Sequence, residues 1–235
     1  MKIFIDLGAY IGDTLEIALK EYKEFDKFYA FEPLNRNFTI LAAKFAADNK
    51  IVLLKIAADI SDGMSNIYVT KQGYDGGSLC LGQGDHVENK AELVETVNIS
   101  NYLKKNFDIA DEIILKVDIE GKEYDIFQLM INDGSIKYIK KIFCEWHWKQ
   151  SGISESRHNK IVEELNKYGY PLLGFNMWDE YLAVPRKGIR KVIFPAERKA
   201  MLVLKRYCPR LFYFLVCSLK NIRVIGSNIF CKIDC

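Results

Sequence analysis

The first 33 residues of this 235-residue chain restrict its fold more than any other stretch. Hydrophobic periodicity predicts, in order, a buried strand at 2–7, a glycine-bounded turn at 8–12, a helix at 13–22, a second strand at 28–31 and a carboxylate at Glu32. This order is the first half of a nucleotide-binding βαβ unit, in which an acidic residue roughly 20 positions past the turn accepts hydrogen bonds from ribose hydroxyls. We therefore expect a nucleotide-type ligand at the carboxyl end of the first strand.

The charges around the turn indicate which nucleotide fits. A dinucleotide site needs small residues in the turn so that backbone N–H groups can approach a pyrophosphate, and here Tyr10 adds bulk. Asp6 precedes the turn and Asp13 follows it, and two negative charges repel a pyrophosphate but attract an ammonium and a sulfonium group. This favours S-adenosyl-L-methionine, with its ribose at Glu32 and its methionine end near Asp6. Taken alone, Asp13 is explained equally well as a residue favoured at the start of a helix.

The remaining segments alternate between strand and helix patterns, which predicts a doubly wound α/β fold. Strands are expected at 51–57, 65–70, 92–99, 113–117 and 142–144, and helices near 35–46, 100–107, 124–131 and 155–168. Asn35 and Ser100 are predicted to cap the first two of these helices. Residues 170–175 and 181–184 alternate like a closing antiparallel pair, so we expect a mostly parallel sheet with an antiparallel edge strand. The glycine-rich residues 72–89 have no periodicity, which is typical of a functional loop or lid.

Charge divides the chain into two parts. Residues 186–235 contain twelve Lys or Arg and two acids, a net charge of +10, while residues 1–185 carry −8. We therefore expect one α/β domain over residues 1–185 and a basic, cysteine-containing C-terminal extension. The extension mixes basic and large apolar residues, so it could contact a membrane surface or an anionic, lipid-linked glycan, or it could pack on the domain.

Several classes of function are disfavoured by composition. No recognised nucleic-acid-binding module is present, and we expect no nucleic-acid partner. No apolar run approaches the roughly 20 residues that cross a bilayer, so a cytoplasmic protein is expected, with peripheral membrane contact through the extension as an option. The six cysteines lack the spacing of a metal site, and no metal site is predicted.

Four segments in this order resemble the FkbM-type methyltransferases, which are S-adenosylmethionine-dependent enzymes with a class I Rossmann-like fold. The segments are IDLGAYIGDT, FYAFEPLNRNF, IILKVDIEGKEYDIF and IFCEWH, and the resemblance covers roughly residues 2–184. It implies a cofactor site that follows the motif residues from the glycine turn to the fourth core strand. The expected cofactor-binding residues are Asp6, Gly8, Ala9, Tyr10, Gly12, Asp13, Thr14, Glu32, Pro33, Asn37, Ala58, Asp59 and Asp118. Within this set Ala58 and Asp59 would face the adenine, although Asp59 taken singly also reads as an ordinary loop residue.

Catalytic candidates follow the fourth and fifth core strands. They are Asp118, Glu120, Glu145 and His147, and an acceptor hydroxyl needs such a base within about 3 Å. His147 has the intrinsic pKa of a base near neutral pH, and the neighbouring tryptophans could desolvate it or stack on a sugar. The alternatives are an inert packed histidine at His147 and a helix-capping role for Glu120. His158, in a charged helix, is expected on the solvated surface.

The sequence thus predicts an S-adenosylmethionine-dependent methyltransferase that acts on a hydroxyl, of a sugar, a glycan or a natural product. One alternative is a binding protein that keeps this fold and the cofactor site without turnover. A second is a nicotinamide-dependent Rossmann oxidoreductase, which Tyr10 and the flanking acids disfavour.

Overall fold

The computed structural model describes residues 1–69, 77–78, 91–148, 151–170 and 173–174. By its internal contacts the chain divides into Met1–Tyr181 and Leu182–Cys235, and every described residue belongs to the first unit. The predicted basic extension, residues 186–235, and most of the predicted lid, residues 72–89, lie outside the described residues. Among the described residues no helix has the length and apolar character that a membrane span requires.

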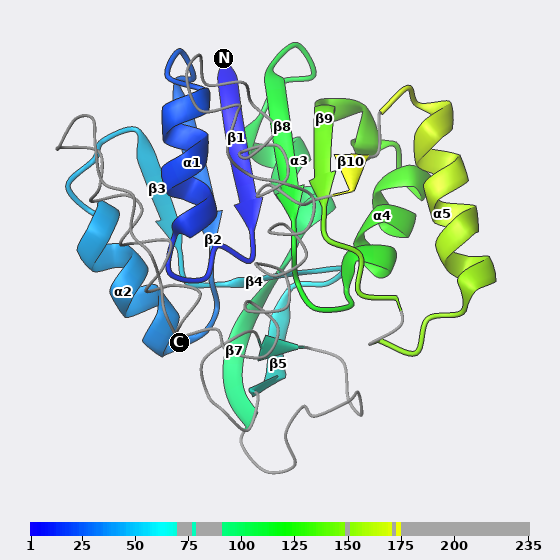
Figure 1. Cartoon of the computed structure of the whole chain (residues 1–235), viewed down its shortest axis with the longest axis horizontal. Helices are drawn as coiled ribbons and strands as arrows, with labels where there is room; N and C mark the ends of the chain where they lie inside the picture. The colour runs from blue at the N-terminus through cyan, green and yellow to red at the C-terminus, as the bar shows by residue number, and fades with distance from the viewer. Residues whose placement is uncertain (70–76, 79–90, 149–150, 171–172, 175–235) are drawn as a thin grey trace, which may run out of the picture. The chain divides into compact units, whose positions relative to one another are not determined.

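A six-stranded sheet forms the centre of the first unit, and each pair of neighbouring strands in it is parallel (Figure 1). In spatial order its strands are β10 (Leu173–Gly174), β9 (Ile139–Cys144), β8 (Glu112–Val117), β1 (Lys2–Leu7), β2 (Lys27–Phe31) and β3 (Ile51–Leu54). The helices are α1 (Asp13–Glu21), α2 (Asn35–Phe45), α3 (Ile99–Asn106), α4 (Glu123–Asn132) and α5 (Glu155–Lys167), with a 3-10 turn η1 (Ser135–Tyr138). The predicted α/β, Rossmann-like architecture is confirmed.

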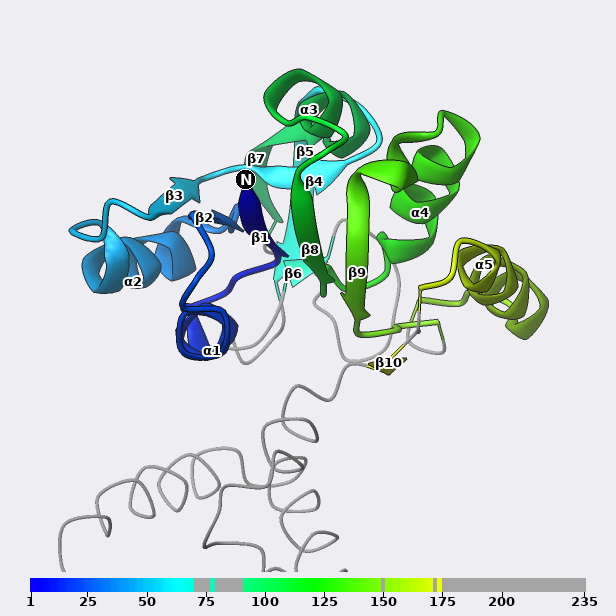
Figure 2. The ribbon, with the colours of Figure 1, turned by 90° about the horizontal axis from the view of Figure 1, so that it is seen from above.

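Helices cover both faces of the sheet, as Figure 2 shows end-on. Successive strand side chains point to opposite faces, so Ile3, Ile5 and Leu7 of β1 pack with α3, α4 and α5, while Phe4 packs with α1 and α2. Both faces of β1 are therefore buried, which explains why its sequence is a nearly continuous apolar run. Asp6 is the charged residue that interrupts this run, and its role belongs to the candidate functional site described below.

A second, four-stranded sheet lies beyond the end of the first (Figure 1). Its strands, in spatial order, are β4 (Ala57–Asp59), β7 (Ala91–Asn98), β5 (Gly63–Val69) and β6 (Gly77–Ser78). The single strand predicted at 51–57 is wrong, because the chain forms β3 and β4 in different sheets. The partner of β3 is β2, which ends before Pro33, and proline has no N–H to continue a ladder. Beyond Leu54 the chain therefore leaves the sheet, and Ala57–Asp59 pairs with β7 instead.

Two further expectations about local structure need correction. The segment predicted to close the sheet as an antiparallel pair contributes β10, which pairs with β9 in parallel, and its expected partner at 181–184 lies outside the described residues. Neither predicted cap is used. α2 begins at Asn35 with Leu34 as its N-cap, while the side chain of Asn98 caps α3 by accepting a hydrogen bond from the backbone N–H of Asn101. Ser100 is instead buried, and its hydroxyl contacts Asp133 and Ser135.

At Gly8 the first turn lies very close to Asp118, the residue that follows β8. Its φ is +81°, and an added Cβ would stand 1.9 Å from the carbonyl oxygen of Asp118. Gly134 has a similar φ of +78° with no atom within 4 Å of that position. We expect Gly134→Ala to lower the free energy of unfolding by about 1–2 kcal/mol, the cost of a left-handed alanine. Gly8→Ala should cost about 1–3 kcal/mol more, because of overpacking. Equal losses for the two variants in urea unfolding would contradict the close approach.

Candidate functional site

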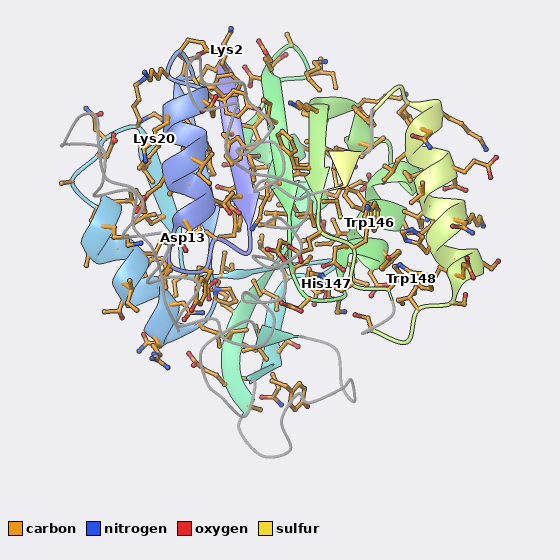
Figure 3. All side chains as sticks on the ribbon, viewed as in Figure 1. Lys2, Asp13, Lys20, Trp146, His147 and Trp148 are labelled. Carbon is orange, nitrogen blue, oxygen red and sulfur yellow. The ribbon has the colours of Figure 1, made fainter. Side chains whose placement is uncertain are left out.

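The candidate residues gather at the carboxyl edge of the main sheet, where open α/β sheets bind their ligands. β1, β8 and β9 are parallel and end at Leu7, Val117 and Cys144, so the segments that follow them lie at one edge. Figure 3 shows His147 and Asp13 at this edge and Lys2 at the opposite one. The sequence-based expectation that these segments meet is therefore met by the fold.

A buried ion pair joins β1 to β8 directly beneath this edge. Asp6 and Lys116 are 0% and 1% exposed, and their Oδ1 and Nζ atoms are 2.8 Å apart. The same Nζ donates a hydrogen bond of 2.6 Å to the carbonyl oxygen of Gly8 and lies 3.5 Å from Oδ2 of Asp118. Burial lowers the pKa of Lys116, but the charges of Asp6 and Asp118 outweigh this and hold the pKa above its ordinary value. Asp6 thus contacts Lys116, which supports the turn from below, and the predicted contact of Asp6 with a ligand stays a prediction.

Glu32 is held beside the glycine turn by three donors. Its carboxylate accepts hydrogen bonds from the backbone N–H of Tyr10 (2.9 Å), the backbone N–H of Leu34 (3.0 Å) and Nδ2 of Asn37 (3.3 Å). Burial nevertheless dominates and raises the pKa of Glu32 to about 7. A carboxyl group that is only 4% exposed and so costly to ionise is suited to accept further hydrogen bonds from ligand hydroxyls.

The turn itself is tied to β2. The backbone N–H groups of Gly8 and Ala9 both donate to the carbonyl oxygen of Phe31, at 3.0 and 2.9 Å. Among the non-glycine residues that the structure describes, only Tyr10 and Glu120 have a positive φ, of 52° and 55°. Both lie at this edge, and such strained residues concentrate at functional sites.

The other expected cofactor-binding residues differ from one another in their contacts and burial. Asp13 is half-buried, and its Oδ1 lies 3.6 Å from Nζ of Lys44 on α2, which agrees with the role of a helix-start residue. Asp59 is buried, and its Oδ1 accepts a hydrogen bond from the backbone N–H of Ile60 at 2.8 Å and lies 3.3 Å from Nζ of Lys122. Their predicted contacts with the methionine end and the adenine stay predictions. The remaining members of the set are buried or half-buried: Ala9, Gly12, Thr14, Pro33, Asn37 and Ala58.

Glu123 organises the loop after β8. Glu123 is fully buried and accepts hydrogen bonds from the backbone N–H groups of Ile119 (3.1 Å) and Gly121 (2.9 Å). Its Oε1 also lies 2.9 Å from Nδ1 of His147. The alternative in which Glu120 caps α4 is therefore wrong, because Lys122 is the N-cap residue and Glu123 holds the loop.

The second nitrogen of His147 faces carboxylates. Nε2 lies 3.6 Å from Glu120, 3.9 Å from Asp118 and 3.9 Å from Glu145, while the imidazole is 7% exposed. Burial lowers the pKa of His147, but the hydrogen bond with Glu123 and the surrounding negative charges raise it to about 9. Burial raises the pKa of Glu120 to about 7.

The four predicted catalytic residues are thus brought together, and three of them also have the spacing of metal ligands. One ligand atom each from Asp118, Glu120 and His147 lies within 4.8 Å of the other two.

The tryptophans beside His147 pack within the protein. Trp146 contacts Tyr124 and Phe127 of α4, with ring centroids 5.2 and 5.5 Å apart. Trp148 stacks on His158 at 5.3 Å and an interplanar angle of 16°. The expectation of a solvated His158 is wrong, because its Nδ1 also forms a hydrogen bond with the hydroxyl of Tyr124 at 2.9 Å. Trp146 therefore packs against α4 and supports the site, while the stacking of a tryptophan on a sugar stays a prediction.

Two important residues, Lys116 and Glu123, were missed as site residues. The signal for Lys116 was present, because a lone lysine inside the apolar run IILKV needs a buried anionic partner. The signal for Glu123 was weaker, since a glutamate in the first turn of a helix is ordinary.

The sequence matches a known protein family. The model of the methyltransferase FkbM domain matches residues 6–172 of the chain. The chain belongs to the FkbM methyltransferase domain family. Among solved structures it resembles methyltransferase FkbM from Methylobacillus flagellatus KT, with 16% identity, a TM-score of 0.41 and coverage of 69% of this chain and 38% of that one. The chain thus spans well under half the length of that relative. No curated protein matches the sequence.

We expect the Asp6–Lys116 pair to be essential to the stability of this FkbM domain. Lys116→Met leaves a buried carboxylate without its cation and should lower the free energy of unfolding by about 3–5 kcal/mol. The double variant Asp6→Asn/Lys116→Met removes both charges and should regain a large part of that loss. Urea unfolding of the three proteins at pH 7 measures both effects, and a single variant as stable as the wild type would show that the pair does not hold the edge.

Proposed function

We propose that this chain is an S-adenosylmethionine-dependent methyltransferase that methylates a hydroxyl of a polar acceptor, a sugar or a glycan hydroxyl being the expected class. Family membership supports methyl transfer, since FkbM methyltransferases generally use this cofactor. The observation that carries the proposal is the position of Glu32, a buried carboxylate hydrogen-bonded to the glycine turn at the end of β2. Two ribose hydroxyls would donate to it and offset its desolvation.

The residues present fit the rest of this cofactor. The edge is acidic, with Asp118 28% exposed and Asp13 34% exposed at the side chain, and this charge suits a ligand that carries an ammonium and a sulfonium. Bound S-adenosylmethionine supplies a methyl group already activated on sulfur. The protein then has to align donor and acceptor and to exclude water.

The acceptor is proposed to lie against the cluster of Asp118, Glu120, Glu145 and His147. With its ribose held by Glu32, the cofactor would supply its methyl group to the acceptor oxygen and keep the electron pair of the broken sulfur–carbon bond. The hydroxyl proton has to leave, and the cluster provides the groups that hold it.

The C-terminal extension, residues 186–235, is proposed to take part in binding the acceptor. Its positive charge would attract an anionic or lipid-linked acceptor or a membrane surface. We propose no nucleic-acid partner.

The pKa of Glu32 makes cofactor binding depend on pH. Ribose hydroxyls favour the ionised carboxylate, so binding lowers this pKa from about 7 and releases a proton. The affinity for S-adenosylhomocysteine should therefore rise, by about tenfold, between pH 6 and pH 8. Glu32→Gln should bind more weakly with a flatter profile, while Glu24→Gln, on an exposed turn, should behave like the wild type. Calorimetry measures all three proteins, and a flat wild-type profile would remove Glu32 from the ribose site.

His147 should affect turnover more than cofactor binding. We expect His147→Gln to lower the rate of methyl transfer by about 100-fold or more, because it removes the imidazole around which the proton-holding cluster is arranged. The dissociation constant for S-adenosylhomocysteine should stay within about threefold. His158→Gln is the matched control, because His158 contacts Tyr124 and Trp148 and is not a member of the cluster. The rate is measured with a hydroxyl acceptor that the wild type methylates, and an unchanged rate for His147→Gln would exclude it from the reaction.

A further inference from the structure

We propose that Asp118, Glu120 and His147 form a binding site for one divalent cation of the first transition row. The site lies within the proposed acceptor site, so its role in methyl transfer rests on the proposed function, whereas cation binding itself does not. No sequence pattern predicts it, because its ligands come from two loops that only the parallel pairing of β8 and β9 brings together.

The spacing of the ligand atoms suits a single ion. Nε2 of His147 lies 3.6 Å from Oε2 of Glu120 and 3.9 Å from Oδ1 of Asp118, and all three ligand atoms lie within 4.8 Å of one another. Nitrogen and oxygen ligands bind such ions at about 2.0–2.2 Å, so the ligands of one ion stand roughly 3–4 Å apart. Small side-chain rotations would bring the three atoms to that spacing.

His147 gives an observation independent of the acidic cluster. Its side chain is 93% buried, since 7% is exposed, and its Nε2 points among carboxylates. The distances from Nε2 to the carboxylate oxygens of Glu120, Asp118 and Glu145, 3.6–3.9 Å, exceed those of a hydrogen bond. A largely buried imidazole whose Nε2 faces two carboxylates at 3.6 and 3.9 Å is the arrangement that a metal ion between the three groups would complete.

The residues behind the ligands are those of a metal site. A metal-binding histidine almost always donates its other ring N–H to a carboxylate or carbonyl, which fixes its tautomer and orientation. Here Nδ1 lies 2.9 Å from Glu123, and the backbone N–H groups of Ile119 and Gly121 hold that carboxylate in turn. Asp118 is oriented in the same way, because its Oδ2 lies 3.5 Å from Lys116 while its Oδ1 faces His147. Both ligand orientations are thus fixed in the absence of an ion.

The ligand types indicate which ions fit. One imidazole with two carboxylates suits Mn²⁺, Fe²⁺, Co²⁺ or Zn²⁺, whereas Mg²⁺ and Ca²⁺ favour oxygen ligands alone. Access is available, because the side chains of Asp118 and Glu120 are each 28% exposed. Three protein ligands leave coordination positions open. An acceptor hydroxyl bound there would become more acidic, and its proton could pass to Glu145, which is 49% exposed, and then to water.

Mn²⁺ is the probe that tests the site most directly. After treatment with a chelator, the full chain is titrated with Mn²⁺ while free Mn²⁺ is followed by electron paramagnetic resonance. We expect one ion per chain, with Mg²⁺ at least tenfold weaker, and a nitrogen coupling from the imidazole in the pulsed spectrum. His147→Gln should lose this coupling and bind at least tenfold more weakly, as should Glu120→Gln, whose more exposed side chain makes a folding defect less of a concern. Glu163→Gln, an exposed acid on α5, is the matched control and should bind like the wild type.

The outcomes separate the cation site from the proposed function. No saturable Mn²⁺ binding to the wild type, or equal binding to all variants, would overturn the cation site. So would a bound ion without nitrogen coupling. Binding of S-adenosylhomocysteine by the same proteins is measured in parallel without metal, so its loss would count against the cofactor site alone. Methyl transfer that continues at the full rate with a chelator present would exclude the proposed role of the cation in the reaction.

Discussion

The buried ion pair between Asp6 and Lys116 is the interaction on which the rest of the site depends. An isolated charge at either position would be strongly unfavourable in the core, so the two side chains are tied to each other and fix the ends of β1 and β8 together. The ammonium group also donates a hydrogen bond to the carbonyl oxygen of Gly8, in the turn after β1, and lies near Asp118, in the loop after β8. One cation therefore connects the turn proposed to hold the cofactor with the loop proposed to meet the acceptor.

Above this pair, the two halves of the site use carboxylates in different ways. Glu32 and Glu123 are both buried and bound by backbone N–H groups, so they act as fixed acceptors that define the shape of a turn and of a loop. Asp118 and Glu120 are partly exposed and face His147. The open side of this edge thus carries carboxylates, which favour cationic ligands over phosphates.

Much of this arrangement could be predicted from the sequence, because the strongest signals are local. The apolar run of β1, the glycine turn and Glu32 fix a βαβ start, and parallel strands necessarily bring their carboxyl ends to one edge. The division of residues 51–57 between two sheets could not be predicted, since it depends on where the partner strand β2 ends. The role of Glu123 and the packing of His158 were missed for a related reason. Both depend on contacts across elements, with His147 and with Tyr124 respectively, that helical periodicity does not encode.

The central claim is that the carboxyl edge of the main sheet binds a cationic methyl donor and rejects a diphosphate cofactor. The most direct measurement is a pair of crystal structures of the full chain, grown with S-adenosylhomocysteine and with NAD in equal excess. The account predicts density for the first ligand, with its ribose hydroxyls on Glu32, and none for the second. A diphosphate bound beside Tyr10, or no density for S-adenosylhomocysteine at this edge with the ligand in large excess, would contradict it.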